Sequence, residues 1–206
     1  GCSTPCAFFD QVSTSGEDLL AEALALNTVE GYQQYLDTCE PFCSDEQRGQ
    51  VMGELAERNF VDAQKYAEAH EWANLAAEYG NYGAQFRLGV FYEEGRSVET
   101  NLQEAEHWYL LAAQSGYPAA QLALGQLYLR HKLYGEAVKW LRIAADQNHG
   151  GAQFELGNMY FYGQAVAQSN REAEKWYRMA AEQGVKDAEL RLAAVQGDEG
   201  AQTNVA

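Results

Sequence analysis

Proline, methionine and basic residues are scarce in this chain. Its 206 residues include three prolines, three methionines and 14 Lys plus Arg against 30 Asp plus Glu, so the formal net charge is −16. Few prolines and abundant Ala, Leu, Glu and Gln favour helix. The negative charge argues against nucleic acid as a partner, because its phosphates would be repelled. No apolar run approaches the roughly 18 residues that a membrane span needs, and no secretory signal is recognisable at the start, as in a mature or trimmed chain.

Motifs for catalysis are also absent. The chain has no G-x-S-x-G, no phosphate-binding loop and no G-x-G-x-x-G. The segment HEWAN, from His70 to Asn74, resembles the zinc motif H-E-x-x-H but lacks the second histidine. The histidines share no metal-ligand spacing. We therefore predict no catalytic residue, no cofactor and no metal ion.

The cysteines are two C-x-x-x-C pairs within the first 43 residues: Cys2, Cys6, Cys39 and Cys43. An even, clustered set predicts two disulfides and hence an exported protein. Antiparallel pairing would join Cys2 to Cys43 and Cys6 to Cys39, although four cysteines permit three connectivities. A zinc site is a weaker alternative, since structural zinc prefers tighter ligand spacing and no histidine lies nearby. In a third interpretation Gly1-Cys2 resembles the end of a bacterial lipobox and Cys2 carries a lipid; reduced thiols are a fourth.

Four tryptophans open four similar stretches. WANLAAEYG starts at Trp72, WYLLAAQSG at Trp108, WLRIAADQN at Trp140 and WYRMAAEQG at Trp176. A second string follows each tryptophan by 12 residues: AQFRLGVFY, AQLALGQLY, AQFELGNMY and a frayed AELRLAAVQ. Successive tryptophans are 36, 32 and 36 residues apart. Self-similarity at such a period predicts a solenoid.

Each repeat predicts two helices, A and then B. In the first helix A, Ala84, Leu88 and Tyr92 recur at i, i+4 and i+8, on one buried face. Glycine follows the leucine in three copies, although glycine costs about 1 kcal/mol inside a helix, so a neighbouring helix is expected to come too close for a Cβ atom. These glycines are Gly89, Gly125 and Gly157. In helix B, Trp108 lies between Ala105 and Ala112, and its indole is expected to fill a gap between layers.

The ends of the helices are also predictable. Each helix B is followed by a residue that suits a left-handed terminal conformation: Gly80, Gly116, Asn148 and Gly184. The next helix A begins within three or four residues, which favours antiparallel neighbours. Between helices A and B the long copies carry Val98 or Val166, each expected to plug an apolar gap. The middle copy lacks four residues in this loop, which accounts for its shorter period.

The pattern A-x-x-x-L-G-x-x-Y, then G-x-x-V, then A-x-x-W-x-x-x-A-A-x-x-G resembles the Sel-one-like repeat family, relatives of the tetratricopeptide repeats. The resemblance covers residues 69–196, with full units at 84–119, 120–151 and 152–187 between a preceding helix B and a trailing helix A. It implies an all-α fold, an α-solenoid whose antiparallel helix pairs form a right-handed superhelix with a concave surface lined by the A helices. It also implies a role as adaptor or scaffold. The last unit departs from the pattern at Ala193, which stands in the glycine place.

Residues 1–68 lack the repeat. Ser15 is a candidate N-cap for a helix to about residue 26, Asn27 or Thr28 for a helix to about residue 37, and Ser44 with Gln47 forms a capping box for a helix to about residue 58. A long helix over 61–79 follows and becomes the first helix B. Because a solenoid end exposes apolar surface, we expect residues 1–68 to form a helical N-terminal cap stapled by disulfides. The helix over 188–196 is expected to cover the other end, with a flexible tail over 197–206.

By analogy with tetratricopeptide repeats, the concave face is lined by helix A positions on either side of the leucine of the L-G pair. The candidate binding residues are Phe86, Val90, Glu93, Gln126, Arg130, Asn158, Phe161 and Tyr162. Phe86 is equally a candidate for packing between adjacent A helices. Aromatic and amide side chains on a rigid groove suit an extended peptide or a helix.

The sequence therefore predicts a non-catalytic scaffold of the bacterial cell envelope, periplasmic or secreted, that binds a protein or peptide on its concave face. One alternative is an envelope protein that recognises peptidoglycan or another glycan through Phe161 and Tyr162. Another is an enzyme that uses the N-terminal cysteines. A lipid on Cys2 would anchor the protein without a transmembrane segment.

Overall fold

The computed structural model describes residues 20–21, 23–25, 28–39, 43–60 and 65–203, and the chain divides into two compact units, residues 1–108 and 109–206. The helices of the first unit are α2 (Val29–Thr38), α3 (Asp45–Phe60), α4 (Tyr66–Glu78) and α5 (Tyr82–Glu94). Helix α6 (Leu102–Gln114) crosses the unit boundary. The helices of the second unit are α7 (Pro118–Arg130), α8 (Tyr134–Asp146), α9 (Gly150–Tyr162), α10 (Asn170–Glu182) and α11 (Lys186–Thr203). In the described ranges, no helix combines the length and the apolar character that crossing a membrane requires.

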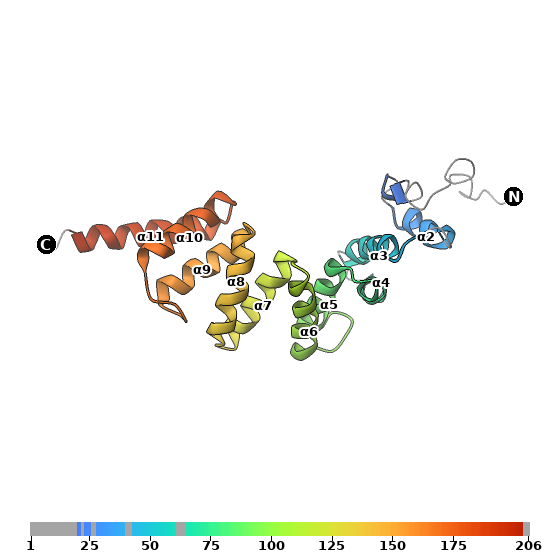
Figure 1. Ribbon diagram of the computed structural model, residues 1–206, viewed down its shortest axis with the longest axis horizontal. Helices are drawn as coiled ribbons and strands as arrows, with labels where there is room; N and C mark the ends of the chain where they lie inside the picture. Colours follow the sequence, from blue (N-terminus) through green and yellow to red (C-terminus); the bar gives the residue numbers. More distant parts are fainter. Residues whose placement is uncertain (1–19, 22, 26–27, 40–42, 61–64, 204–206) are drawn as a thin grey trace. The chain divides into compact units, whose positions relative to one another are not determined.

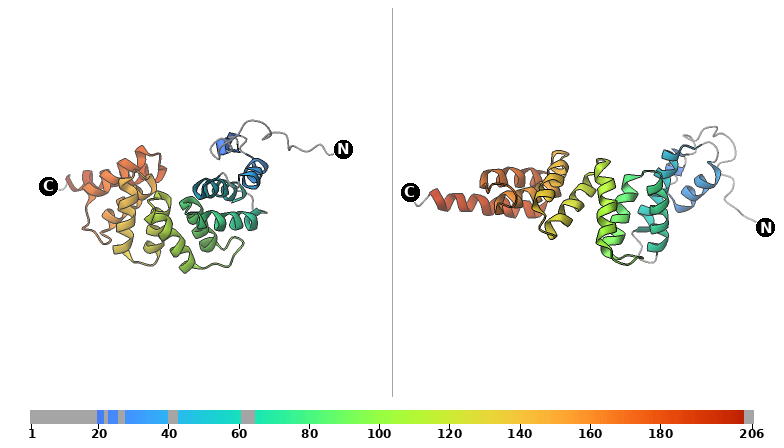
Figure 2. Two further views of the ribbon diagram at one scale, coloured as in Figure 1. Left: turned by 45° about the vertical axis from the view of Figure 1, so that its right-hand side comes forward. Right: turned by 60° about the horizontal axis from the view of Figure 1, so that its bottom comes forward.

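Consecutive helices pack side by side within each unit, as Figures 1 and 2 show from three directions. In the first unit α3 contacts both α4 and α5. In the second unit α8 packs between α7 and α9, and α10 packs between α9 and α11. The chain is therefore an all-α solenoid of helix pairs, as predicted, in which α5, α7, α9 and α11 are A helices and α4, α6, α8 and α10 are B helices.

Helix length is constant through the repeats, whereas loop length is not. Each helix from α4 to α10 has 13 residues. The loop between α7 and α8 covers residues 131–133, while the corresponding loops of the other two repeats cover 95–101 and 163–169. The short period of the middle copy therefore arises from its loop, as predicted. Val98 and Val166, from the two long loops, each pack against the core of their unit.

The predicted caps at Thr28 and Ser44 are confirmed. Thr28 caps α2, since its Oγ1 accepts a hydrogen bond of 3.0 Å from the backbone N–H of Gly31. Ser44 and Gln47 form the capping box of α3: the backbone N–H of Gln47 donates to Ser44 Oγ at 3.2 Å, and that of Ser44 to Gln47 Oε1 at 2.9 Å. Ser15, the first predicted cap, lies outside the described residues.

Two repeat glycines lie where a neighbouring helix leaves no room for a side chain. A Cβ atom on Gly125 would lie 2.6 Å from Leu141 Cγ, and one on Gly157 would lie 2.5 Å from the ring of Tyr177. Each obstructing residue belongs to the helix B that follows its helix A. The predicted close approach of the two helices of a pair is therefore confirmed at both positions.

The tryptophans are less buried than predicted. Only Trp176 is buried, with 6% of its surface exposed, whereas Trp72, Trp108 and Trp140 are half-buried. The next residue in each copy is the fully buried one: Ala73, Tyr109, Leu141 and Tyr177. One residue turns a helix by about 100°, so the face centred on this next position, not on the indole, points into the pair.

The predicted left-handed positions are also confirmed. The backbone φ angle is +77° at Gly80, +88° at Gly116, +80° at Gly184 and +64° at Asn148. Asparagine tolerates this conformation better than other residues with a Cβ atom, which accounts for its use in the third repeat. At these four positions the chain turns from a helix B into the next helix A.

A buried glutamine joins consecutive repeats. Gln121 Nε2 donates to the carbonyl oxygen of Ala113 at 3.1 Å, and Gln153 Nε2 donates to that of Ala145 at 3.3 Å. Both glutamines are at most 1% exposed. The acceptor lies eight residues earlier in each case, in the last turn of the preceding helix B. Each of these carbonyls also accepts the backbone N–H of Gly116 or Asn148, so the glutamine supplies a second donor at the end of helix B.

The N-terminal region has its own core, in which Tyr32, Tyr35 and Cys39 of α2 and its C-cap pack against Val51 and Leu55 of α3. Cys39 is buried, Cys43 is half-buried, and both are free thiols in the structure. Cys2 and Cys6 lie outside the described residues. The predicted disulfides are therefore not confirmed and stay a prediction.

One predicted helix boundary differs from the structure: α11 continues to Thr203, beyond the predicted end at 196. Helix α4 is described from Tyr66, and residues 61–64 of the predicted long helix lie outside the described ranges. The division into a cap, repeats and a tail stays a prediction.

Candidate functional site

The candidate residues of the first unit lie on α5 and are partly covered. Phe86, Val90 and Glu93 are half-buried. The guanidinium carbon of Arg87 lies 5.9 Å from the centre of the Phe86 ring, and Arg87 forms an ion pair with Glu57 of α3. Phe86 therefore lies beside the ion pair that joins α5 to α3, and both of its predicted roles stay predictions.

In the second unit, a chain of hydrogen bonds joins two of the candidates on different helices. Gln126 of α7 donates through Nε2 to Glu155 Oε1 of α9 at 3.2 Å. Asn158 donates through Nδ2 to the other carboxylate oxygen of Glu155 at 3.3 Å and accepts a 2.9 Å bond from the hydroxyl of Tyr177. Glu155 thus brings Gln126 and Asn158 together. The hydrogen bond from the Tyr177 hydroxyl fixes the orientation of the Asn158 side chain.

Burial lowers the acidity of the Tyr177 hydroxyl. Desolvation raises the pKa of Tyr177 to about 12, while the nearby Arg191 partly opposes the increase. The hydroxyl therefore keeps its proton at neutral pH and donates to Asn158. The Asn158 amide is held with its nitrogen toward Glu155, so the polar groups of this face have defined orientations.

Tyr162 is the C-terminal residue of α9 and contacts the next A helix, α11. Arg191 of α11 donates through Nη1 to the Tyr162 hydroxyl at 3.1 Å, and its guanidinium carbon lies 5.9 Å from the centre of the ring. The Phe161 and Tyr162 rings meet edge to face at 5.0 Å between their centres. Tyr162 remains 52% exposed, and Leu190 beside Arg191 is 73% exposed. An aromatic and an aliphatic side chain therefore face solvent next to an ordered polar row.

Three residues that the sequence prediction missed share one place in the repeat, and Tyr177 of α10, also missed, lies elsewhere. Arg87, Glu155 and Arg191 each lie three residues after the first alanine of the A string. Each bonds to the helix two places earlier in the chain, 30, 29 and 29 residues back: Arg87 to Glu57, Glu155 to Gln126, and Arg191 to Tyr162. The sequence signal was a charge at this position in three of the four copies, with Ala123 in the other. We call Gln126, Glu155, Asn158, Tyr162, Tyr177 and Arg191 the A-helix site; the remaining candidate, Arg130, is exposed at the end of α7.

Neither metal binding nor cysteine chemistry is favoured by the described residues. Within the described ranges, no group of three or more His, Cys, Asp or Glu side chains is placed to hold a metal ion. Burial raises the pKa of Cys39 to about 11, with further contributions from the adjacent Cys43 and an opposing one from Arg48. A buried thiol that stays protonated at neutral pH is a poor nucleophile.

The sequence matches one protein family over much of its length. A family model of the Sel1 repeat matches residues 57–81, 83–117, 118–149 and 151–185, together more than half of the chain. The first match begins in α3, within the residues predicted as the cap, so a repeat-like pair precedes the three full units. Among curated proteins, none matches this chain at a significant level.

Two crystal structures are similar over most of this chain. A Sel1 repeat protein from Oxalobacter formigenes is 28% identical with a TM-score of 0.73, and the match covers 86% of this chain and 73% of that one. A protective antigen of uropathogenic Escherichia coli strains with an SLR fold is 27% identical with a TM-score of 0.64. That match covers 88% of this chain but only 44% of the antigen.

Proposed function

The chain belongs to the Sel1 repeat family, and from this premise we propose that it is a non-catalytic scaffold of the bacterial cell envelope that binds a protein through its A helices. Sel1 repeat proteins are generally scaffolds for protein–protein interactions. The ligand proposed for this chain is an extended peptide or a helix of a partner protein. The two similar crystal structures are of bacterial proteins, which supports a bacterial source.

The exposure of Tyr162 and Leu190 next to the A-helix site carries the proposal. Tyrosine and leucine offer apolar surface to a partner, and the hydrogen bonds among Gln126, Glu155 and Asn158 hold polar groups ready for a peptide backbone. Because these groups are already oriented, less side-chain entropy is lost on binding. The raised pKa and burial of Cys39 favour a binding protein over an enzyme that uses this cysteine.

A double variant tests the binding surface. Tyr162→Ala/Leu190→Ala removes exposed side chains and should leave stability within about 0.5 kcal/mol. The matched control is Leu133→Ala/Ile143→Ala, whose side chains are 51% and 45% exposed on and next to α8. Crosslinking in the host cell, followed by mass spectrometry, should recover a partner with the wild type and the control but not with the double variant. Equal recovery by all three proteins contradicts the proposed surface.

The choice of a protein over a glycan ligand needs a second measurement. Isothermal titration with soluble peptidoglycan fragments should give no heat of binding. Binding that depends on Phe161 and Tyr162 would favour the glycan alternative instead.

The envelope location has its own test. Fractionation of the host should place the protein with the periplasmic, secreted or membrane-anchored proteins. Intact mass would reveal a lipid on Cys2, if present. Recovery of the native protein in the cytoplasmic fraction contradicts this part of the proposal and leaves the binding surface unaffected.

A further inference from the structure

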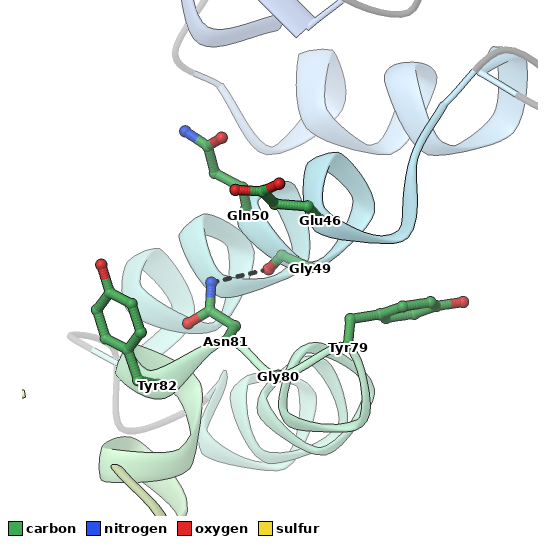
Figure 3. A pocket seen from close by; sticks show the side chains of 7 residues that line it. All are labelled: Glu46, Gly49, Gln50, Tyr79, Gly80, Asn81 and Tyr82. Carbon is green, nitrogen blue, oxygen red and sulfur yellow. Dashed lines mark hydrogen bonds between the residues drawn. The ribbon is translucent and has the colours of Figure 1, made fainter. Parts of the chain in front are cut away.

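A pocket of the first unit lies where α3 passes the turn between α4 and α5. Its volume is about 410 Å³. Figure 3 shows Tyr79 and Tyr82 on opposite sides of Asn81, with Glu46 and Gln50 projecting from α3 above it. We call it the Glu46 pocket. None of its lining residues belongs to the A-helix site.

The floor of the pocket is tightly built. Asn81 Nδ2 donates to the carbonyl oxygen of Gly49 at 3.0 Å, and its Oδ1 accepts from the backbone N–H of Ala84 at 2.9 Å, which caps α5. Gly49 is buried, and a Cβ atom there would lie 2.8 Å from Tyr79 Cβ. Both polar atoms of the Asn81 amide therefore form hydrogen bonds within the protein and hold the turn in place. A ligand would be recognised by the residues around Asn81.

The residues around the floor combine one negative charge with two aromatic rings. Glu46 and Gln50 are one helical turn apart on α3 and are exposed, and Tyr82 is 52% exposed. Among the described residues, no lysine or arginine lines the pocket. Helix α4 ends at Glu78 beside it, and the partial negative charge of a helix C-terminus favours a cation there. Residues 1–60, which include α3, hold 11 Asp plus Glu against two Arg.

We propose that the Glu46 pocket binds a lysine or arginine side chain from a basic segment of a protein partner. A carboxylate pairs with the cationic head group, and a tyrosine ring attracts it through its negative face. The Gln50 amide oxygen supplies a further acceptor for the N–H donors of such a side chain. The inference rests on the chain binding proteins, as proposed above, but it uses residues that the A-helix site does not.

Tetralysine is a suitable probe for the full-length chain. In a titration followed by two-dimensional amide NMR, tetralysine should shift the signals of Gly49, Gly80 and Asn81, and its affinity should fall with added salt. Acetylated tetralysine, which has the same length without the side-chain charges, should cause no such shifts. Chitotetraose, a neutral glycan with acetamido groups, serves as the carbohydrate probe and should not bind.

Variants separate this pocket from general attraction to an acidic protein. Glu46→Gln and Tyr82→Ala should each weaken tetralysine binding about threefold, and the double variant about tenfold. The matched controls are Glu68→Gln, an exposed acid in the first turn of α4, and Tyr162→Ala, a tyrosine with the same 52% exposure in the A-helix site. Neither control should change tetralysine affinity. Unchanged circular dichroism spectra would show that the variants fold.

Several outcomes overturn the proposal. Equal weakening by Glu68→Gln would mean that tetralysine responds to net charge alone, and binding of chitotetraose or acetylated tetralysine at the same amides would mean that the pocket recognises something other than a cation. The two proposals fail separately. If Glu46→Gln and Tyr82→Ala leave tetralysine binding unchanged while Tyr162→Ala/Leu190→Ala abolishes recovery of the partner, only the pocket proposal fails. If the pocket variants weaken tetralysine binding while the partner is still recovered with Tyr162→Ala/Leu190→Ala, only the A-helix site fails.

Discussion

A single glycine determines how closely the two helices of a repeat approach. At Gly157 the space that a Cβ atom would occupy is filled by the ring of Tyr177, and at Gly125 by Leu141. The frayed copy carries Ala193 at the same place, on α11, and this alanine is exposed. In the described residues no helix B packs against this position, and a side chain is accommodated there.

Substitution of this glycine tests the close approach. Gly157→Ala should lower the free energy of unfolding by about 1–3 kcal/mol, because a packed aromatic ring must move. Gly135→Ala is the control: no atom lies within 4 Å of its Cβ position, so alanine should be neutral or stabilise α8 by up to about 1 kcal/mol. Urea unfolding measures both changes. If the two variants unfold alike, the tight packing at Gly157 is refuted.

Cys39 provides a test of the N-terminal core and of the predicted disulfides. Its burial and raised pKa of about 11 predict slow alkylation by iodoacetamide in the native protein at pH 8 and fast alkylation in urea. Peptide mapping by mass spectrometry, without reductant, measures the modification. Absence of alkylation in urea, with recovery after reduction, would instead establish a disulfide at this cysteine.

At the scale of a helix, the sequence pattern predicts where each helix lies in the chain better than which of its faces is buried. The caps at Thr28 and Ser44 were predictable, because the donor and acceptor are three residues apart. The buried face of helix B was not, since an offset of one residue moves it from Trp140 to Leu141. The partners of Glu155 and Arg191 were not predictable either, because they lie 29 residues away and depend on how neighbouring A helices align.

The rotation of α8 can be measured by two alanine substitutions. Leu141→Ala should lower the free energy of unfolding by about 2–5 kcal/mol, because Leu141 is fully buried against Gly125. Trp140→Ala should lower it less, since the indole is half-buried. Urea unfolding of both variants gives the comparison. If Trp140→Ala lowers the free energy of unfolding more than Leu141→Ala does, the indole and not Leu141 is the centre of the buried face.

The contact between α4 and α5 should respond to pH. The His70 ring meets the rings of Phe91 and Tyr92 edge to face at 5.3 and 5.9 Å, and desolvation lowers its pKa below the usual 6.5, with Glu71 opposing the decrease. Between the lowered pKa and 6.5 the unfolded chain binds more protons than the folded chain, so stability falls as the pH decreases through this window. The melting temperature should therefore fall between pH 7.5 and 5.5.

A variant assigns this effect to the histidine. His70→Gln should reduce the pH dependence of the melting temperature, whereas His131→Gln, at an exposed position after α7, should not. A wild-type melting temperature that rises toward pH 5.5 would contradict the assignment. Since His149 is also half-buried with a lowered pKa, part of the dependence should remain in the His70 variant.

For the molecule as a whole, net charge restricts the possible partners. A charge of −16 and an isoelectric point near 4.5 predict that the intact protein passes through a heparin column at low ionic strength. Retention on heparin would contradict this prediction and reopen polyanions as ligands. The acidic surface instead suits partners with basic segments.

The buried glutamines have a consequence for how the molecule is made. Gln121 and Gln153 each bond to a carbonyl only eight residues earlier, so these two joints between repeats close over a very short stretch of chain. A nascent polypeptide can complete such a joint before the next repeat has left the ribosome. Short-range closure of this kind limits the time in which one repeat could pair with the wrong neighbour among near-identical copies.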